Sequence, residues 1–390
     1  MNPELKSKLN VAFTVIIILL CAVLWFIPTG FENPYFTKNK LFEQATVVSV
    51  DNHDLKHLGV VITGTQDIEI KILSGPFTGD TVTAANVLMG QMNIDKVFKT
   101  GDKVLAILNL DKKSEKVVSA RASDMYRSDI EFILFLVFAL FLVFFAKSIG
   151  FRALLSFVFT TLAIWKLLIP LFLKGYPPLP ISFLIVAITT AVIILLITGF
   201  TRKGIVALSG SIAGVALTTV LAIIFGHFFK IPGTVKEFSE MLLYAGFMHL
   251  QLTDIFIAGI FISASGAVMD VAMDIAASQE EVIDKHPRIS TKELITSGFR
   301  VSYAVIGTMT TTLLFAYSGS FTFILMVFMA QGTPTESIFN INFIAAEILQ
   351  TLVGSFGLVL VAPVTAIIGG YVYTYTHQHH EKSVCDPVEH

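Results

Sequence analysis

Two aspartates on an otherwise apolar segment are the residues best placed to do chemistry. Asp270 and Asp274 lie four residues apart, and Gly259, Ser263 and Gly266 precede them at intervals of three and four. This spacing predicts that all five lie on one face of a helix. A charge at mid-bilayer costs about 2.5–3.5 kcal/mol on insertion scales, so a buried carboxylate is a candidate for function. The two carboxylates, Asp270 and Asp274, therefore predict a path for protons or cations.

The same pattern has a simpler interpretation for Asp274. Ser278, Gln279, Glu280 and Glu281 follow at once, so Asp274 can equally mark the inner surface of the membrane. Asp270 lies deeper in the apolar run, where a purely interfacial role fits less well. Both interpretations of Asp274 stay open.

Hydroxyls on the next apolar segment are expected at about the depth of Asp270. Thr308, Thr311 and Thr312 lie there, with Thr310 between them. Such hydroxyls can bond a carboxylate or carry water between helices. They can equally donate to carbonyl oxygens of their own helix, and for any single threonine this second role is the more common one.

A second charged pair is predicted nearer the outer surface. Glu347 in the last apolar segment and Lys166 in the third are expected at comparable depths, and an ion pair between them would remove two costly isolated charges. Lys166 can also extend towards the outer surface on its own. Glycines are expected where helices approach one another closely. These packing glycines are Gly210, Gly214, Gly259, Gly266, Gly354 and Gly357.

The composition explains which elements must position these residues. Of 390 residues, 54% are hydrophobic and 14% are charged, whereas soluble domains usually carry about 25% charged residues. The sequence predicts an α-helical membrane bundle with about eight spans and one small all-β domain outside the membrane. The expected spans are Val11–Pro28, Ile130–Ala146, Ala153–Leu173, Ile181–Phe200, Ile205–Phe229, Leu252–Ala276, Val301–Phe328 and Ile341–Tyr373.

Positive charge in the short loops sets the expected orientation. Lysines and arginines gather before the first span and in every second connection between spans, which places the N- and C-termini inside. The expected divisions are an anchor helix at 1–29, an outer β-rich domain at 30–128, a seven-helix bundle at 129–376 and a cytoplasmic tail at 377–390. The expected location is the bacterial cytoplasmic membrane.

Two smaller elements are also expected. Val235–Leu250 is amphipathic and predicts an interfacial helix. Ser290 and Glu293 have the spacing of a capping box, which predicts the start of a helix that continues into the seventh span. In the outer domain, about six short strands separated by turns predict a small barrel or sandwich, in one version of the oligonucleotide/oligosaccharide-binding type.

Most of the chain resembles the YibE/F family of bacterial multi-pass membrane proteins. The residues that carry the resemblance are the segment from Gly266 to Ala276, the run Thr310–Thr312, the segment from Gly357 to Ala366, and the outer-domain segments Gly75–Asp80 and Thr100–Val104. The resemblance implies a multi-pass membrane protein and implies no mechanism.

A partial resemblance concerns the SecD/SecF proteins and the wider RND superfamily. It rests on the order of Gly266 to Asp270, then Thr311 and Thr312, then the span from Gly357 to Thr365. It implies that Asp270 is a proton-coupling carboxylate. The chain departs from that pattern in having more helices and a much smaller outer domain.

Two hypotheses of function follow. The first is a transporter or exporter that moves an unknown solute or ion along the acidic path, with proton coupling in one version. The second is a non-catalytic scaffold or sensor in which residues 30–128 bind a protein or cell-envelope partner. An enzyme is not expected because HExxH and GxSxG are absent from the sequence. No cofactor, metal site or nucleic-acid partner is expected. With a net charge of −2, the chain lacks the excess of basic residues that is typical of nucleic-acid-binding proteins.

Overall fold

The computed structural model describes residues 3–31, 39–111 and 116–385. The chain divides into two compact units. One comprises Met1–Gly30 and Leu142–His390, and the other is Phe31–Phe141.

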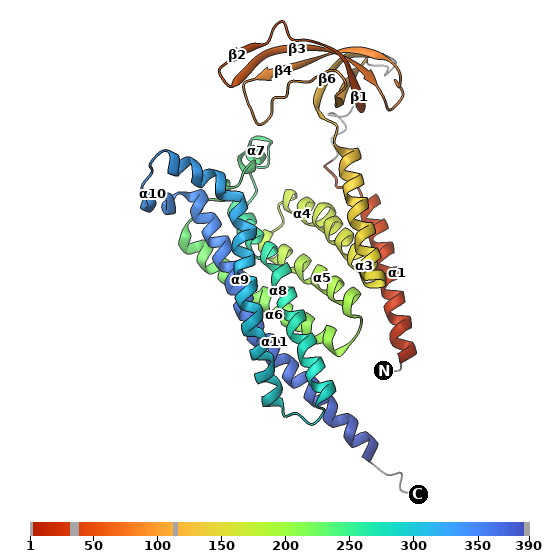
Figure 1. Ribbon diagram of the computed structural model, residues 1–390, viewed down its shortest axis with the longest axis vertical. Coiled ribbons are helices and arrows are strands. Elements are labelled where there is room, and N and C mark those ends of the chain that lie inside the picture. Colours follow the sequence, from red (N-terminus) through yellow and green to blue (C-terminus); the bar gives the residue numbers. More distant parts are fainter. Residues whose placement is uncertain (1–2, 32–38, 112–115, 386–390) are drawn as a thin grey trace. The chain divides into compact units, whose positions relative to one another are not determined.

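The smaller unit contains a closed β-barrel (Figure 1). Its strands are β1 (Lys40–Asp51), β2 (Lys56–Leu58), β3 (Val61–Ile72), β4 (Thr81–Met89), β5 (Lys103–Leu110) and β6 (Val117–Met125). The strand order is β1-β5-β6-β4-β3-β2, and a further pairing of β1 with β3 closes the sheet. Only the β4–β6 pair is parallel among these described strands. The prediction of a small barrel is confirmed.

Alternating side chains fill the barrel. Along β3, Ile68, Ile70 and Ile72 are at most 1% exposed, while the residues between them face outwards. This alternation is the period of a strand with one buried face. The sequence predicted two separate strands in this region, Gly59–Thr63 and Asp67–Ile72, and the structure joins them into the single twelve-residue β3.

A glutamine is buried inside this apolar core. Gln66 is fully buried, and its Nε2 donates to Asn52 Oδ1 at 2.7 Å and to the Phe98 carbonyl at 2.8 Å. Its Oε1 accepts from Asn86 Nδ2 at 3.1 Å and from the Phe98 amide at 3.0 Å. One amide therefore holds the segment around Phe98 against the strands.

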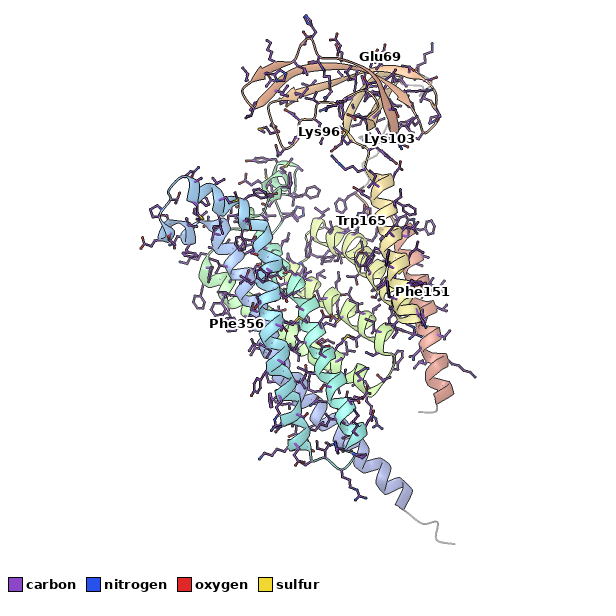
Figure 2. The ribbon with its side chains drawn as sticks, in the orientation of Figure 1. Glu69, Lys96, Lys103, Phe151, Trp165 and Phe356 are labelled. Atoms are coloured by element: carbon purple, nitrogen blue, oxygen red, sulfur yellow. The ribbon has the colours of Figure 1, made fainter. Side chains whose placement is uncertain are left out.

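Asp124 carries a pH-dependent contact of this barrel. Partial burial alone would raise its pKa. Its carboxylate, however, lies 2.8 Å from Nζ of Lys96, the lysine labelled in Figure 2, accepts from the Met125 amide and pairs with Arg127 at 3.0 Å. Together these contacts hold the pKa of Asp124 below its usual range. The stabilisation from a lowered carboxyl pKa is present above the unfolded-state value of about 3.9 and is lost as pH falls through the folded-state value.

Replacing Lys96 with methionine should therefore raise the pKa of Asp124 towards its usual range. The change removes the ammonium hydrogen bond and its charge. A carbon-13 NMR titration of the aspartate carboxyls would measure it. Lys103→Met is the matched control, because Lys103 pairs with Asp129 instead, at 3.3 Å. An equal shift of the Asp124 pKa in both variants would contradict the assignment.

The larger unit is helical. Its helices, with one that begins in the other unit, are α1 (Pro3–Phe26), α3 (Ser128–Ala163), α4 (Ile169–Leu173), α5 (Pro178–Thr198), α6 (Arg202–Phe229), α7 (Ser239–Tyr244), α8 (Leu252–Lys285), α9 (Thr291–Ala330), α10 (Thr335–Asn340) and α11 (Asn342–Cys385). A π-helical turn, Ile164–Leu168, joins α3 to α4. The predicted capping box of Ser290 and Glu293 is present at the start of α9.

Seven helical segments of the described chain are long and apolar enough to cross a membrane. The expected number of about eight is not confirmed. The difference arises in Ser128–Leu173, a continuous segment of 46 residues where two spans were expected. A straight α-helix of this length would measure roughly 70 Å, more than twice the thickness of the hydrocarbon core.

This long segment is not straight. Lys147 has φ 48° and ψ −125°, which is not helical. A Cβ built on Gly150 would overlap the carbonyl oxygen of Leu142, eight residues earlier. In a straight helix those residues would be about 12 Å apart. The chain therefore turns back sharply at Lys147.

The expected interfacial helix Val235–Leu250 is mostly wrong. The structure has a 3₁₀ turn at Gly233–Val235 and the six-residue α7, with Lys236 and the residues after α7 in irregular conformations. This irregular segment supplies a residue of the candidate site.

The centre of the helical unit is α8. It contacts α5, α6, α9 and α11, and its buried side packs into one apolar core with residues such as Phe261, Val268 and Val271. At its far end, Gln279 is 1% exposed and donates to the carbonyls of Leu294 in α9 and Ala366 in α11. The position of α8 is thus fixed by four neighbouring helices and by one buried amide.

Candidate functional site: a polar face and an ion pair

The predicted stripe lies on one face of α8, and this face is exposed. Gly259, Ser263, Gly266, Asp270 and Asp274 are all exposed, while the opposite face of the same helix is buried. A face of this kind is unusual on an apolar helix. Its small residues leave the carboxylates open to water, to lipid or to another chain.

Both carboxylates lack a partner in the described part of the chain. Neither Asp270 nor Asp274 forms a hydrogen bond or an ion pair with another described residue. They lie four positions, and so about 6 Å of helix rise, apart. Two carboxylates at this spacing on one helix face offer neighbouring oxygen ligands for a proton or a cation.

The threonines of α9 do not reach these carboxylates. Thr308 donates to the Val305 carbonyl at 3.1 Å, Thr310 to Ile306 at 2.8 Å and Thr312 to Thr308 at 3.1 Å. These are the bonds to the helix's own backbone that were the alternative interpretation. Thr308, Thr311 and Thr312 are exposed on α9, and their place in an ion path stays a prediction.

The predicted partner of Glu347 is wrong. Its carboxylate lies 2.7 Å from Lys236 Nζ, in the irregular segment before α7. Lys166 instead donates to the Ile27 carbonyl at 3.1 Å and lies 5.9 Å from the ring centroid of Trp165. Glu347 and Lys166 were expected at similar depths in the membrane, but depth does not determine the direction in which the Lys166 side chain extends.

The ion pair continues into a short polar chain. Lys236 Nζ also donates to Gln350 Oε1, and Gln350 Nε2 donates to Ser263 Oγ, each at 3.3 Å. Ser263 is a member of the exposed face of α8. Hydrogen bonds therefore connect the Lys236–Glu347 pair to the same helix face that carries Asp270.

A cavity of about 450 Å³ opens beside this chain. Its lining includes Lys236, Gly259 and Gln350, with apolar walls from Phe256 and Leu242. The Lys236 ammonium lies 5.6 Å from the ring centroid of Phe256, a distance at which a cation is attracted to an aromatic face. The cavity gives the polar face an opening at the N-terminal part of α8.

Lys236 is the residue that the sequence analysis missed. It lies in Val235–Leu250, the segment that was expected to form an amphipathic interfacial helix. The usable signal was a lysine in the stretch between two apolar spans, seven residues after Phe229, the last residue of α6.

The glycines divide into two groups. A Cβ on Gly210 would overlap the Thr365 side chain, one on Gly357 would overlap Thr218, and one on Gly214 would lie 2.6 Å from Val361. These three hold α6 close to α11. Gly354 has ordinary contacts, with Ala264 at 3.5 Å from its built Cβ.

Gly259 and Gly266 are not packing glycines. Nothing described lies within 4 Å of a Cβ built on either residue. The expectation that a neighbouring helix approaches this face is therefore wrong for the described chain. Their small size keeps the face of α8 open instead.

This division predicts opposite effects of the same substitution. Gly210→Ala should destabilise the helical unit by about 1–3 kcal/mol, because Thr365 is fully buried and cannot move aside. Gly266→Ala should be neutral or slightly stabilising, because alanine favours a helix over glycine. Titration with SDS in mixed micelles would measure both. Equal destabilisation by the two variants would contradict the assignment.

Comparison with known proteins gives the family. The model described as YibE/F-like protein matches residues 134–375, and the YibE/F family N-terminal domain matches residues 43–125. No curated protein and no solved structure matches. The two matched regions include the barrel strands from β3 to β6, the face of α8 and the Lys236–Glu347 pair. The chain therefore belongs to the YibE/F family.

Proposed function

We propose that this protein is a multi-pass transporter that moves a proton or another small cation along the exposed face of α8. The observation that carries the proposal is the pair of carboxylates, Asp270 and Asp274, which lie on an open face of an apolar helix and have no partner among the described residues. In this proposal the protein is not an enzyme and needs no cofactor.

The polar chain from Lys236 to Ser263 supports an entry point for this path. From Ser263 to Asp274 the face rises about 16 Å along the helix. Small residues leave space between these polar groups, since nothing described lies near Gly259 or Gly266. In this proposal a cation enters by the cavity at Lys236 and passes Ser263 on its way to the two aspartates.

The topology belongs to the same proposal. If the turn at Lys147 divides Ser128–Leu173 into two spans, the chain crosses the membrane eight times. Both termini then lie in the cytoplasm, and the barrel lies outside the bacterial cytoplasmic membrane, as positive charge in the short loops favours.

Proton movement in liposomes tests the proposal. The protein would be reconstituted with a pH-sensitive dye inside, and a proton gradient imposed. Wild type should show protein-dependent proton movement, and Asp270→Asn should reduce it at least about tenfold by removing the ionisable group. Asp284→Asn is the matched control, because Asp284 is an exposed aspartate near the end of the same helix.

Two outcomes would count against proton transport. Wild type that behaves like empty liposomes under proton and sodium gradients would remove the support for a coupled pump. Equal losses in Asp270→Asn and Asp284→Asn would indicate a general effect of charge rather than a path through Asp270.

A second candidate is a scaffold or sensor whose barrel binds a protein or cell-envelope partner. The observation that favours it is a set of exposed apolar side chains at one end of the barrel, including Val60, 80% exposed, and Met89, 70% exposed. Leu58 and Met92 are nearby in the sequence and similarly exposed. In this case Asp270→Asn would leave function intact, whereas Val60→Ser/Met89→Ser would reduce partner capture.

A further inference from the structure

A large basic cavity lies where α8 ends and α9 begins. It measures about 930 Å³, and its walls come from the last turn of α8, the connecting loop and the first turns of α9. This is within the usual range of about 300–1,000 Å³ for small-molecule sites. It lies apart from the polar face described above, and the transport proposal does not use it.

Positive charge dominates the lining. Five basic residues, Lys285, His286, Arg288, Lys292 and Arg300, surround the cavity, whereas Glu293 is its one acidic residue. The Glu293 carboxylate is already engaged, since it accepts from the Ser290 amide at 3.1 Å and from the Ser290 hydroxyl at 2.8 Å. It therefore serves the N-cap of α9 rather than the cations.

Only one of these cations has a carboxylate partner within the described residues. Lys285 pairs with Glu281 at 2.6 Å. Arg288, Lys292 and Arg300 have no described carboxylate within 4 Å. Like charges gathered around one cavity repel each other, so an anion placed among them would be stabilised by all three.

The rule that cytoplasmic loops are rich in lysine and arginine explains why basic residues occur here. It does not explain why they converge on one cavity. Arginine and lysine suit phosphate oxygens, arginine through paired N–H groups and lysine as a compact charge. The hydroxyls of Thr296 and Ser297 line the same cavity and add polar groups for an oxygen-rich ligand.

We propose that this cavity binds a phosphate-bearing anion, supplied either by the headgroup of an anionic lipid or by a free phosphate compound. Arg288 and Lys292 hold the phosphate oxygens, and Arg300 completes the positive wall. Basic pockets between membrane helices on the cytoplasmic side are a recognised setting for lipid headgroups. Binding here joins the ends of α8 and α9.

Thermal unfolding of the full-length protein in detergent micelles tests the proposal. One arm adds phosphatidylglycerol or, for comparison, phosphatidylcholine. The other adds inorganic phosphate, or chloride at the same ionic strength. Wild type should unfold at a higher temperature with phosphatidylglycerol, with phosphate or with both, and Arg288→Gln/Lys292→Gln should bind at least about tenfold more weakly.

Two further variants separate binding from folding and from bulk charge. Arg288→Lys/Lys292→Arg keeps both charges and should keep most of the response. Lys8→Gln/Arg152→Gln removes two charges elsewhere and should respond like wild type. A response to inorganic phosphate supports a soluble ligand, and a response to phosphatidylglycerol alone supports a lipid headgroup. A wild type that responds to neither, or a response equal in Arg288→Gln/Lys292→Gln, would overturn the proposal.

Discussion

Replacing Lys236 with methionine should lower the free energy of unfolding of the helical unit by about 2–4 kcal/mol. The reason is the charge left behind. The side chain of Glu347 is 7% exposed, and it would remain buried without the ammonium that now lies 2.7 Å away. Removing one partner of a buried ion pair typically costs about 3–5 kcal/mol. The lower range applies here because Lys236 itself is 39% exposed.

A double-mutant cycle would measure this pair. Unfolding by SDS in mixed micelles would be compared for wild type, Lys236→Met, Glu347→Gln and Lys236→Met/Glu347→Gln. Glu347→Gln should cost less, because the half-exposed lysine left behind can reach water. The double variant should recover much of the loss, since neither charge remains. A Lys236→Met protein as stable as wild type would show that the pair does not hold the segment before α7.

Replacing Gln66 with leucine should destabilise the barrel by about 3 kcal/mol or more. Leucine is close in size, but it makes none of the four hydrogen bonds of the fully buried amide. The Phe98 amide and carbonyl would then be buried without partners, and each such group costs about 1–3 kcal/mol. The segment around Phe98 should detach before the strands separate.

Hydrogen exchange in the full-length protein would locate the effect. In Gln66→Leu, the Phe98 amide should exchange faster and the amides of β3 should follow. Gln44→Leu is a matched control, because Gln44 is an outward-facing barrel glutamine whose Nε2 bonds to Asp129 at the surface. Unchanged protection of Phe98 in Gln66→Leu would contradict the role given to Gln66.

Repeating patterns were predictable from the sequence. The two-residue alternation predicted short strands in the outer domain, and apolar length predicted helices that can cross a membrane. The three- and four-residue spacing placed Asp270 and Asp274 on one face of α8. Each of these features depends on residues close together along the chain.

Contacts between distant segments were not predictable in the same way. Glu347 pairs with Lys236 rather than Lys166, because depth along a helix does not define the direction in which a side chain points. Gly210 and Gly266 have similar neighbours in the sequence, yet α11 covers only Gly210. Which face of a helix is covered depends on the packing of the whole bundle.

At Lys147, the backbone conformation and the side-chain charge favour different residue types. Its φ of 48° with ψ of −125° is a conformation that glycine adopts freely and a lysine adopts at a cost of about 1–3 kcal/mol. In the topology proposed above, a glycine would relax this turn but would also remove one of the positive charges that favour a cytoplasmic loop. Under that topology, biogenesis as well as stability shapes this position.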